Sequence, residues 1–160
     1  MLVFSEYQTD TIDLALDFYG YEDCPKNYEF GPSVRDNLVL HYITKGKGVL
    51  HFNKKEIHLE AGDLFLLPKN MVTYYKADEE EPWSYYWIGI SGTKVSDFMR
   101  FSTLHEKGFL KKTEVETEKI GQFMERLVHK AEASKMTSHY QLHLLSQIYE
   151  LLFLISEVAP

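Results

Sequence analysis

The spacing of hydrophobic residues changes once along the chain. From Leu14 to Ile90, apolar residues recur at every second position or form short runs between turn residues, a pattern typical of half-buried β-strands. After Gly92 they recur every three or four positions, which predicts helices. The pattern therefore predicts a single domain over residues 1–160, with a β part at about 10–92 and a helical part at about 93–160.

Turn residues divide the first part into at least seven short strands. The run from Leu38 to Ile43 is rich in β-favouring residues, and Lys45-Gly46-Lys47-Gly48 ends it with a glycine turn that predicts a hairpin to a partner strand at 49–52. Further strands are expected at 14–18, 56–59, 64–67, 71–75 and 83–90. Many short strands separated by regular turns indicate an antiparallel sandwich or barrel.

Three helices are expected in the second part. A short one suits residues 94–101, and a longer one is predicted to begin near Thr113, because Thr113 and Glu116 have the spacing of a capping box. A third is expected at about 138–158. The last helix has two apolar stripes at helical spacing: Leu144, Ile148, Leu151, Ile155 and Val158 form one, and Leu142, Leu145, Tyr149 and Leu152 form the other.

A helix that is apolar on two faces must bury both. We expect one face to cover the β part and the other to meet a second copy of the chain about a two-fold axis, giving a homodimer. The residues that we assign to the dimer interface are Leu144, Ile148, Leu151 and Ile155. The alternative is a helix enclosed within one protomer. Polar residues interrupt the run, so no membrane-spanning helix is expected.

Composition limits the possible partners and the compartment. The 160 residues include 17 Lys and Arg and 24 Asp and Glu, which gives a formal net charge of −7. Basic residues do not cluster, so the chain has no electrostatic footprint for a nucleic-acid backbone. The single cysteine, Cys24, excludes an internal disulfide and, with no secretion signal, indicates a cytoplasmic location.

Several motifs together resemble one known family. The segments are 30–38 (FGPSVRDNL), 41–43 (HYI), 45–48 (KGKG), 60–64 (EAGDL) and 67–68 (LP). They are similar to the N-terminal effector-binding domain of AraC-type transcription regulators, above all those of sugar use in Gram-positive bacteria, over about residues 10–155. The resemblance implies a cupin-type antiparallel β-barrel, or jelly roll, followed by two or three helices. It also implies a homodimer through the last helix and a small effector inside the barrel.

In that family two helix-turn-helix motifs follow this domain. Nothing of the kind follows Ser156, so we expect the chain to be a fragment that meets DNA only through a missing C-terminal domain. An expected role in transcription regulation, as a sugar-responsive activator, follows from the resemblance.

A cupin enzyme is the alternative within the same fold. Metal-dependent cupins carry histidine and glutamate at four positions, which correspond in this chain to Ser33, Arg35, Val39 and Thr73. A first-row metal needs imidazole and carboxylate donors at such points. We therefore expect no metal, no cofactor and no enzymatic activity, with a small sugar epimerase-like or metal-dependent cupin enzyme as the alternative.

Alternation along 83–90 places Trp83, Tyr85 and Trp87 on one side of a strand. The resemblance implies that Tyr85 and Trp87 face the interior, that Trp87 stacks on a sugar ring and that Tyr75 lines the pocket. A sugar needs a flat ring under its apolar face and polar groups around its edge, and a mono- or oligosaccharide is the expected effector. The predicted ligand-binding residues are Arg35, His41, Tyr75, Tyr85 and Trp87. A purely structural Trp87, or an Arg35 paired with Asp36 at the surface, is the alternative.

Overall fold

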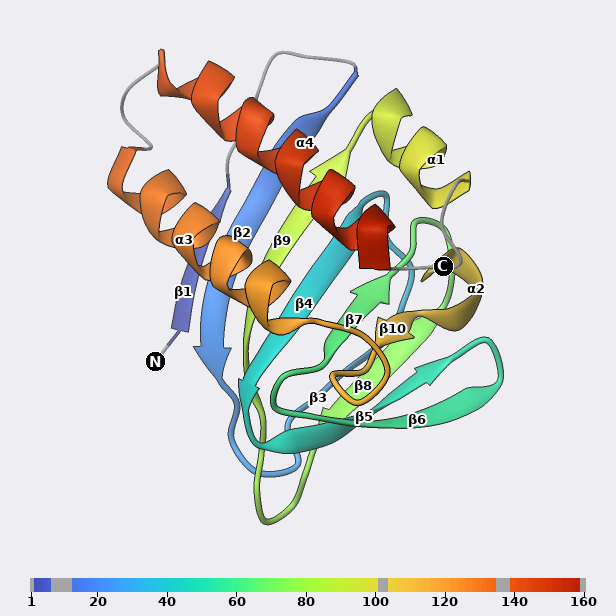
Figure 1. Ribbon diagram of the computed structural model, residues 1–160. Helices are drawn as coiled ribbons and strands as arrows, with labels where there is room; N and C mark the ends of the chain where they lie inside the picture. The colour runs from blue at the N-terminus through green and yellow to red at the C-terminus, as the bar shows by residue number, and fades with distance from the viewer. Residues whose placement is uncertain (1, 7–12, 101–103, 135–138, 159–160) are drawn as a thin grey trace.

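In the computed structural model, which describes residues 2–6, 13–100, 104–134 and 139–158, two antiparallel sheets face one another and helices cover the outer face of the larger sheet (Figure 1). The strands are β1 (Leu2–Glu6), β2 (Ala15–Asp23), β3 (Glu29–Ser33), β4 (Leu38–Lys45), β5 (Lys47–Phe52), β6 (Lys55–Glu60), β7 (Leu64–Leu67), β8 (Thr73–Ala77), β9 (Ser84–Ser91) and β10 (Phe109–Leu110). The helices are α1 (Thr93–Arg100), α2 (Leu104–Lys107), α3 (Glu118–Ser134) and α4 (Tyr140–Val158).

The strand order confirms the predicted jelly-roll class. The larger sheet has the order β1-β2-β9-β4-β7-β10 and the smaller one β3-β8-β5-β6. The described strands therefore form two sheets rather than one closed barrel. The turn at Gly46 does exist, with a φ of +76°. The predicted hairpin is wrong, however, because β4 pairs with β7 and β9 while β5 pairs with β6 and β8.

Alternate residues of the larger sheet enter two different cores. Leu40, Leu66 and Ile88 point toward the helices, whereas Phe65 and Trp87 point toward the smaller sheet. The central strands are consequently buried on both faces, which is why their sequences read as unbroken apolar runs. The core between the two sheets, which contains Phe65 and Trp87, is here called the second core. It fills only part of the space between the sheets, and the remainder is an open cavity.

The assignment of the dimer interface to one stripe of α4 is corrected by the structure. Its members have between 0% and 1% of their surface exposed and pack into the protomer's own core with α3 and the larger sheet; they are Leu144, Ile148, Leu151 and Ile155. A residue already enclosed by its own chain cannot contact a second one. The apolar residues left exposed on α4 are Leu142, Tyr149 and Phe153.

The start of α3 also differs from the prediction. Thr113 lies in a turn in which the amides of Glu114 and Val115 donate to the carbonyl of Lys111, and the helix begins at Glu118. Thr117, just before it, donates its hydroxyl to the carbonyl of Gly62 at 2.6 Å. The capping spacing at Thr113 therefore marks a local turn rather than a helix start. Of the described helices, none combines the length and apolar content needed to cross a lipid bilayer.

Candidate ligand-binding site

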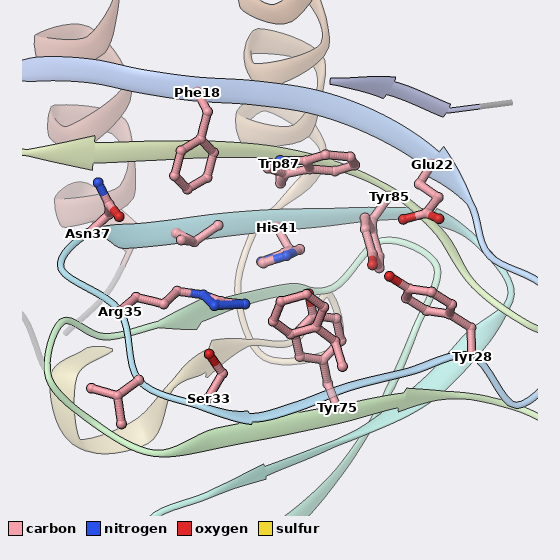
Figure 2. Close-up of a pocket in the computed structure, with 13 residues that line it drawn as sticks. Phe18, Glu22, Tyr28, Ser33, Arg35, Asn37, His41, Tyr75, Tyr85 and Trp87 are labelled. Atoms are coloured by element: carbon pink, nitrogen blue, oxygen red, sulfur yellow. The ribbon is translucent and has the colours of Figure 1, made fainter. Parts of the chain in front are cut away.

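An open cavity of about 560 Å³ lies between the two sheets. Pockets that bind small molecules are usually of this size and mostly apolar, with a few placed polar groups. Figure 2 shows the side chains that face it, which come from β2, β3, β4, β8, β9 and the segments around β3. The lining residues are Phe18, Glu22, Tyr28, Phe30, Ser33, Val34, Arg35, Asn37, Val39, His41, Tyr75, Tyr85 and Trp87.

Three rows of paired residues form the floor of this cavity. Phe18 is paired with Gly89, Trp87 with His41, and Glu22 with Tyr85, each on neighbouring strands of the larger sheet. The ring of Phe18 packs directly on the backbone of Gly89, because any side chain there would clash with it: a Cβ would lie 2.2 Å from Cζ of the phenylalanine ring. The floor therefore presents two rings, Phe18 and Trp87, in successive rows.

His41 is the most enclosed polar group of the floor. Its ring stacks on Phe65, with centroids 4.2 Å apart, and meets Tyr85 edge-on at 5.0 Å. Burial, and next the nearby charge of Arg35, hold the pKa of His41 well below its usual value, so the ring is neutral at neutral pH. Its Nδ1 atom is buried and has no hydrogen-bond partner among the described residues.

Arg35 lies in the connection between β3 and β4, and its guanidinium reaches into the cavity toward Tyr75 (Figure 2). It also lies over the ring of Phe30, with Cζ 4.6 Å from the ring centroid. Burial raises the pKa of Tyr75 to about 12, although Arg35 acts in the opposite direction. The phenol therefore stays protonated, and this end of the cavity presents mainly hydrogen-bond donors.

The opposite end of the cavity is rich in oxygen atoms. Glu22 from β2 and Tyr28 point toward Tyr85, as Figure 2 shows. Burial raises the pKa values of Tyr28 and Tyr85, and the negative charge of Glu22 raises both further. Burial also raises the pKa of Glu22 itself. This end combines a carboxylate acceptor with two protonated phenols.

All five residues predicted to bind the ligand line this one cavity; they are Arg35, His41, Tyr75, Tyr85 and Trp87. Whether they touch a ligand stays a prediction. Sequence reasoning missed Phe18, Glu22, Tyr28 and Asn37. The sequence pattern does not reveal that Phe18 and Glu22 face the cavity. A bulge between Leu16 and Phe18 shifts the alternation by one residue, so the side chains after it point to the opposite face from the one that the pattern predicts.

The positions that correspond to metal ligands in other cupins carry unsuitable side chains. Ser33, Arg35 and Val39 line the cavity, and Thr73 is buried with its hydroxyl unpartnered among the described residues. Across the part of the chain that the structure describes, His, Cys, Asp and Glu side chains form no group of three or more able to hold a metal ion. The residues present do not fit the metal centre of this fold.

A jelly roll with an aromatic cavity, in which polar groups stand ready at both ends, is the architecture of a cupin-fold domain for small-molecule ligands. The chain belongs to the family of AraC-like ligand binding domains, whose profile matches residues 15–152.

Curated relatives include the Msm operon regulatory protein of Streptococcus mutans, which is 37% identical over 99% of this chain and 56% of its own length. The raffinose operon transcriptional regulatory protein RafR of Pediococcus pentosaceus is 41% identical over 61% of this chain and 36% of its own. The lactose operon transcription activator of Staphylococcus xylosus is 27% identical over 99% of this chain and 56% of its own length. The chain thus spans about half the length of the curated relatives it matches.

Similar solved structures agree on the fold alone. YhaK from Escherichia coli has a TM-score of 0.50 at 14% identity, covering 57% of this chain and 45% of that one. A cupin superfamily protein from Desulfitobacterium hafniense has a TM-score of 0.43 at 13% identity, covering 57% of this chain and 78% of that one.

Proposed function

We propose that this chain is the effector-binding and dimerisation domain of a transcriptional regulator of sugar use, and that the effector is a saccharide bound in the cavity between the sheets. The observation that carries the proposal is the cavity of about 560 Å³ between the sheets, in which the rings of Phe18 and Trp87 lie close to the guanidinium of Arg35. The names of two relatives, a raffinose operon regulator and a lactose operon activator, support a saccharide as the ligand class.

The chemistry of the lining suits a saccharide. The rings of Phe18 and Trp87 offer flat apolar surfaces, which match the C–H face of a sugar ring. Arg35 offers up to five donors to sugar oxygens, and the phenol of Tyr28 offers a hydroxyl that donates or accepts. A saccharide hydroxyl both donates and accepts, so it can satisfy either partner.

Direct titration tests this proposal. Isothermal titration calorimetry with glucose, galactose, lactose, sucrose and raffinose is expected to show binding of at least one saccharide at micromolar to millimolar concentration. At a ligand concentration of about 100 times Kd, the folded state should gain about 2.7 kcal/mol, which raises the melting temperature. If none of these saccharides binds at millimolar concentration or shifts the melting temperature, a carbohydrate effector is wrong.

In this proposal the chain forms a homodimer, and effector binding acts on DNA binding through the arrangement of its two protomers. The exposed residues of α4 continue as one stripe, formed by Leu142, Tyr149 and Phe153 with the half-buried Leu145 beside them. Exposed apolar surfaces of this kind mark interaction sites. Within the stripe Ser146 carries no charge, and the exposed carboxylates Glu150 and Glu157 stand at its border, one helical turn from Phe153. A second copy of the chain is therefore the proposed occupant.

We expect Phe153→Asp to convert a dimer into a monomer, because a carboxylate would be buried at the centre of the interface without a partner. Analytical ultracentrifugation should show at least a tenfold weaker dimer. His143→Asp on the same helix is the control, since it adds the same group about 100° away from the stripe and should leave the dimer intact. A monomeric wild-type chain, or an unchanged dimer in Phe153→Asp, contradicts the proposal.

DNA binding is assigned in this proposal to a helix-turn-helix part outside this chain, since this chain has a net charge of −7 and its basic residues do not cluster along the sequence. The effector can alter DNA binding only by favouring one arrangement of the two protomers over another.

A further inference from the structure

We propose that the effector is an uncharged saccharide of at least two rings, and that Glu22 and Tyr28, together with Tyr85, form a second subsite that takes the ring remote from Arg35. This inference rests on the proposed function, because it presumes that the cavity binds a saccharide. It adds the minimum size of the ligand, the direction in which it lies and the residues that select it.

The first argument is the length of the floor. Phe18 and Glu22 both face the cavity and lie four residues apart on β2, with regular pairing between them. At about 3.3 Å per residue in a strand, their Cα atoms are about 13 Å apart. The partner residues on β9 run over the same length, from Gly89 to Tyr85. A single pyranose is about as wide as one phenol ring, so it covers one of the rows and leaves the other end empty.

The second argument is the repetition of apolar surface along this length. Phe18 and Trp87 stand in successive rows of the floor, since Phe18 is paired with Gly89 and Trp87 with Gly20. Successive rows on the same face of a sheet are about 6.6 Å apart along the strand, because they are separated by two residues. Two stacking surfaces at this spacing suit two linked sugar rings better than one.

The third argument is the difference between the two ends. Arg35 supplies donors at one end, whereas Glu22 supplies a carboxylate acceptor at the other, beside the phenols of Tyr28 and Tyr85. Neither Arg35 nor Glu22 has an ion-pair partner among the residues that the structure describes. Because Arg35 and Glu22 carry opposite charges at opposite ends of the cavity, they hold a ligand in one direction.

The chemistry of the second subsite explains why a neutral sugar suits it. A sugar hydroxyl can donate to the carboxylate of Glu22 and accept from a phenol at the same time. A phosphate or carboxylate on the ligand would meet like charge at Glu22. Glu22 is half-buried, which strengthens its hydrogen bonds while leaving it open to the cavity.

The test compares oligosaccharides with their component monosaccharides. For the wild-type chain, calorimetry should show that lactose or raffinose binds at least tenfold more tightly than galactose or glucose. Glu22→Gln keeps the shape but removes the charge, and we expect it to weaken oligosaccharide binding about tenfold, since a hydrogen bond to a charged group is the stronger kind. Binding of the monosaccharide should change less than twofold. Tyr28→Phe should show the same pattern with a smaller loss.

Glu56→Gln is the matched control, because it makes the same change at an exposed position of β6, where Glu56 does not line this cavity. It should leave all affinities unchanged. The second subsite is refuted if a monosaccharide binds as tightly as every oligosaccharide, or if Glu22→Gln weakens both classes equally. An absence of binding to all saccharides refutes the proposed function itself, so the two failures are distinct.

Discussion

Trp87→Ala is expected to weaken saccharide binding about 100-fold, equivalent to about 2.7 kcal/mol, when measured by isothermal titration calorimetry. Trp87 lies in the middle row of the floor with 9% of its surface exposed, and its ring meets that of Tyr85 at 5.8 Å. Alanine removes the stacking surface and leaves a gap that water fills. Because the change also removes core contacts, the variant is to be titrated well below its melting temperature.

The tryptophan pair provides an internal control for this prediction. Trp83 is fully buried in the second core and does not line the cavity, whereas Trp87 does. A saccharide should therefore change the emission of Trp87 only. Trp87→Phe keeps a ring, so we expect it to retain binding within about tenfold while the fluorescence change disappears. An unchanged affinity in Trp87→Ala would contradict the stacking role.

What the sequence predicted best is what depends on a local period. The alternation of β9 placed Tyr85 and Trp87 on one side, and the structure confirms that both face the cavity. A two-residue period is set by the backbone of a single strand, so it can be read without knowledge of the partner strands. The change from strands to helices near Gly92 was predictable for the same reason.

What the sequence did not predict depends on pairing between distant segments. The alternation of 14–18 puts Leu16 and Phe18 on one face, but the bulge between them sends Leu16 into the helical core and Phe18 into the cavity. Glu22 enters the cavity through the same shift. The two stripes of α4 are almost equally apolar, so only the packing of the whole protomer determines which of them is buried. The hairpin at Gly46 failed similarly, since strand partners are chosen across the fold.

The Glu60–Leu64 segment, which helped to suggest the family, has a structural role here. Asp63 is buried, with 3% of its surface exposed. Its carboxylate accepts the amide of Glu60 through Oδ2 and that of Lys112 through Oδ1, each at 2.9 Å. It thereby ties the turn before β7 to the connection between β10 and α3. Thr117 binds the same turn through Gly62, so the helical part is anchored to the sheets at this point.

We expect Asp63→Ala to lower the free energy of unfolding by about 3–5 kcal/mol, because two amides lose a charged acceptor in a place that water cannot easily reach. Urea unfolding followed by circular dichroism measures this loss, and Asp63→Asn, which keeps one acceptor, should lose less. Asp78→Ala is the matched control. That carboxylate also accepts two amides, those of Glu80 and Glu81, but in an exposed loop where water can replace it, so the loss should be far smaller.

In Asp63→Ala we expect the free energy of unfolding to fall while the affinity for a saccharide stays unchanged. Asp63 does not line the cavity, so the folded fraction of Asp63→Ala should bind a saccharide with the wild-type affinity, whereas Trp87→Ala should lose affinity. Equal stability of Asp63→Ala and the wild-type chain would show that these two hydrogen bonds contribute nothing net. A loss of affinity would show instead that the anchor of the helical part also shapes the cavity, and that the floor is coupled to α3 through the turn at 61–63.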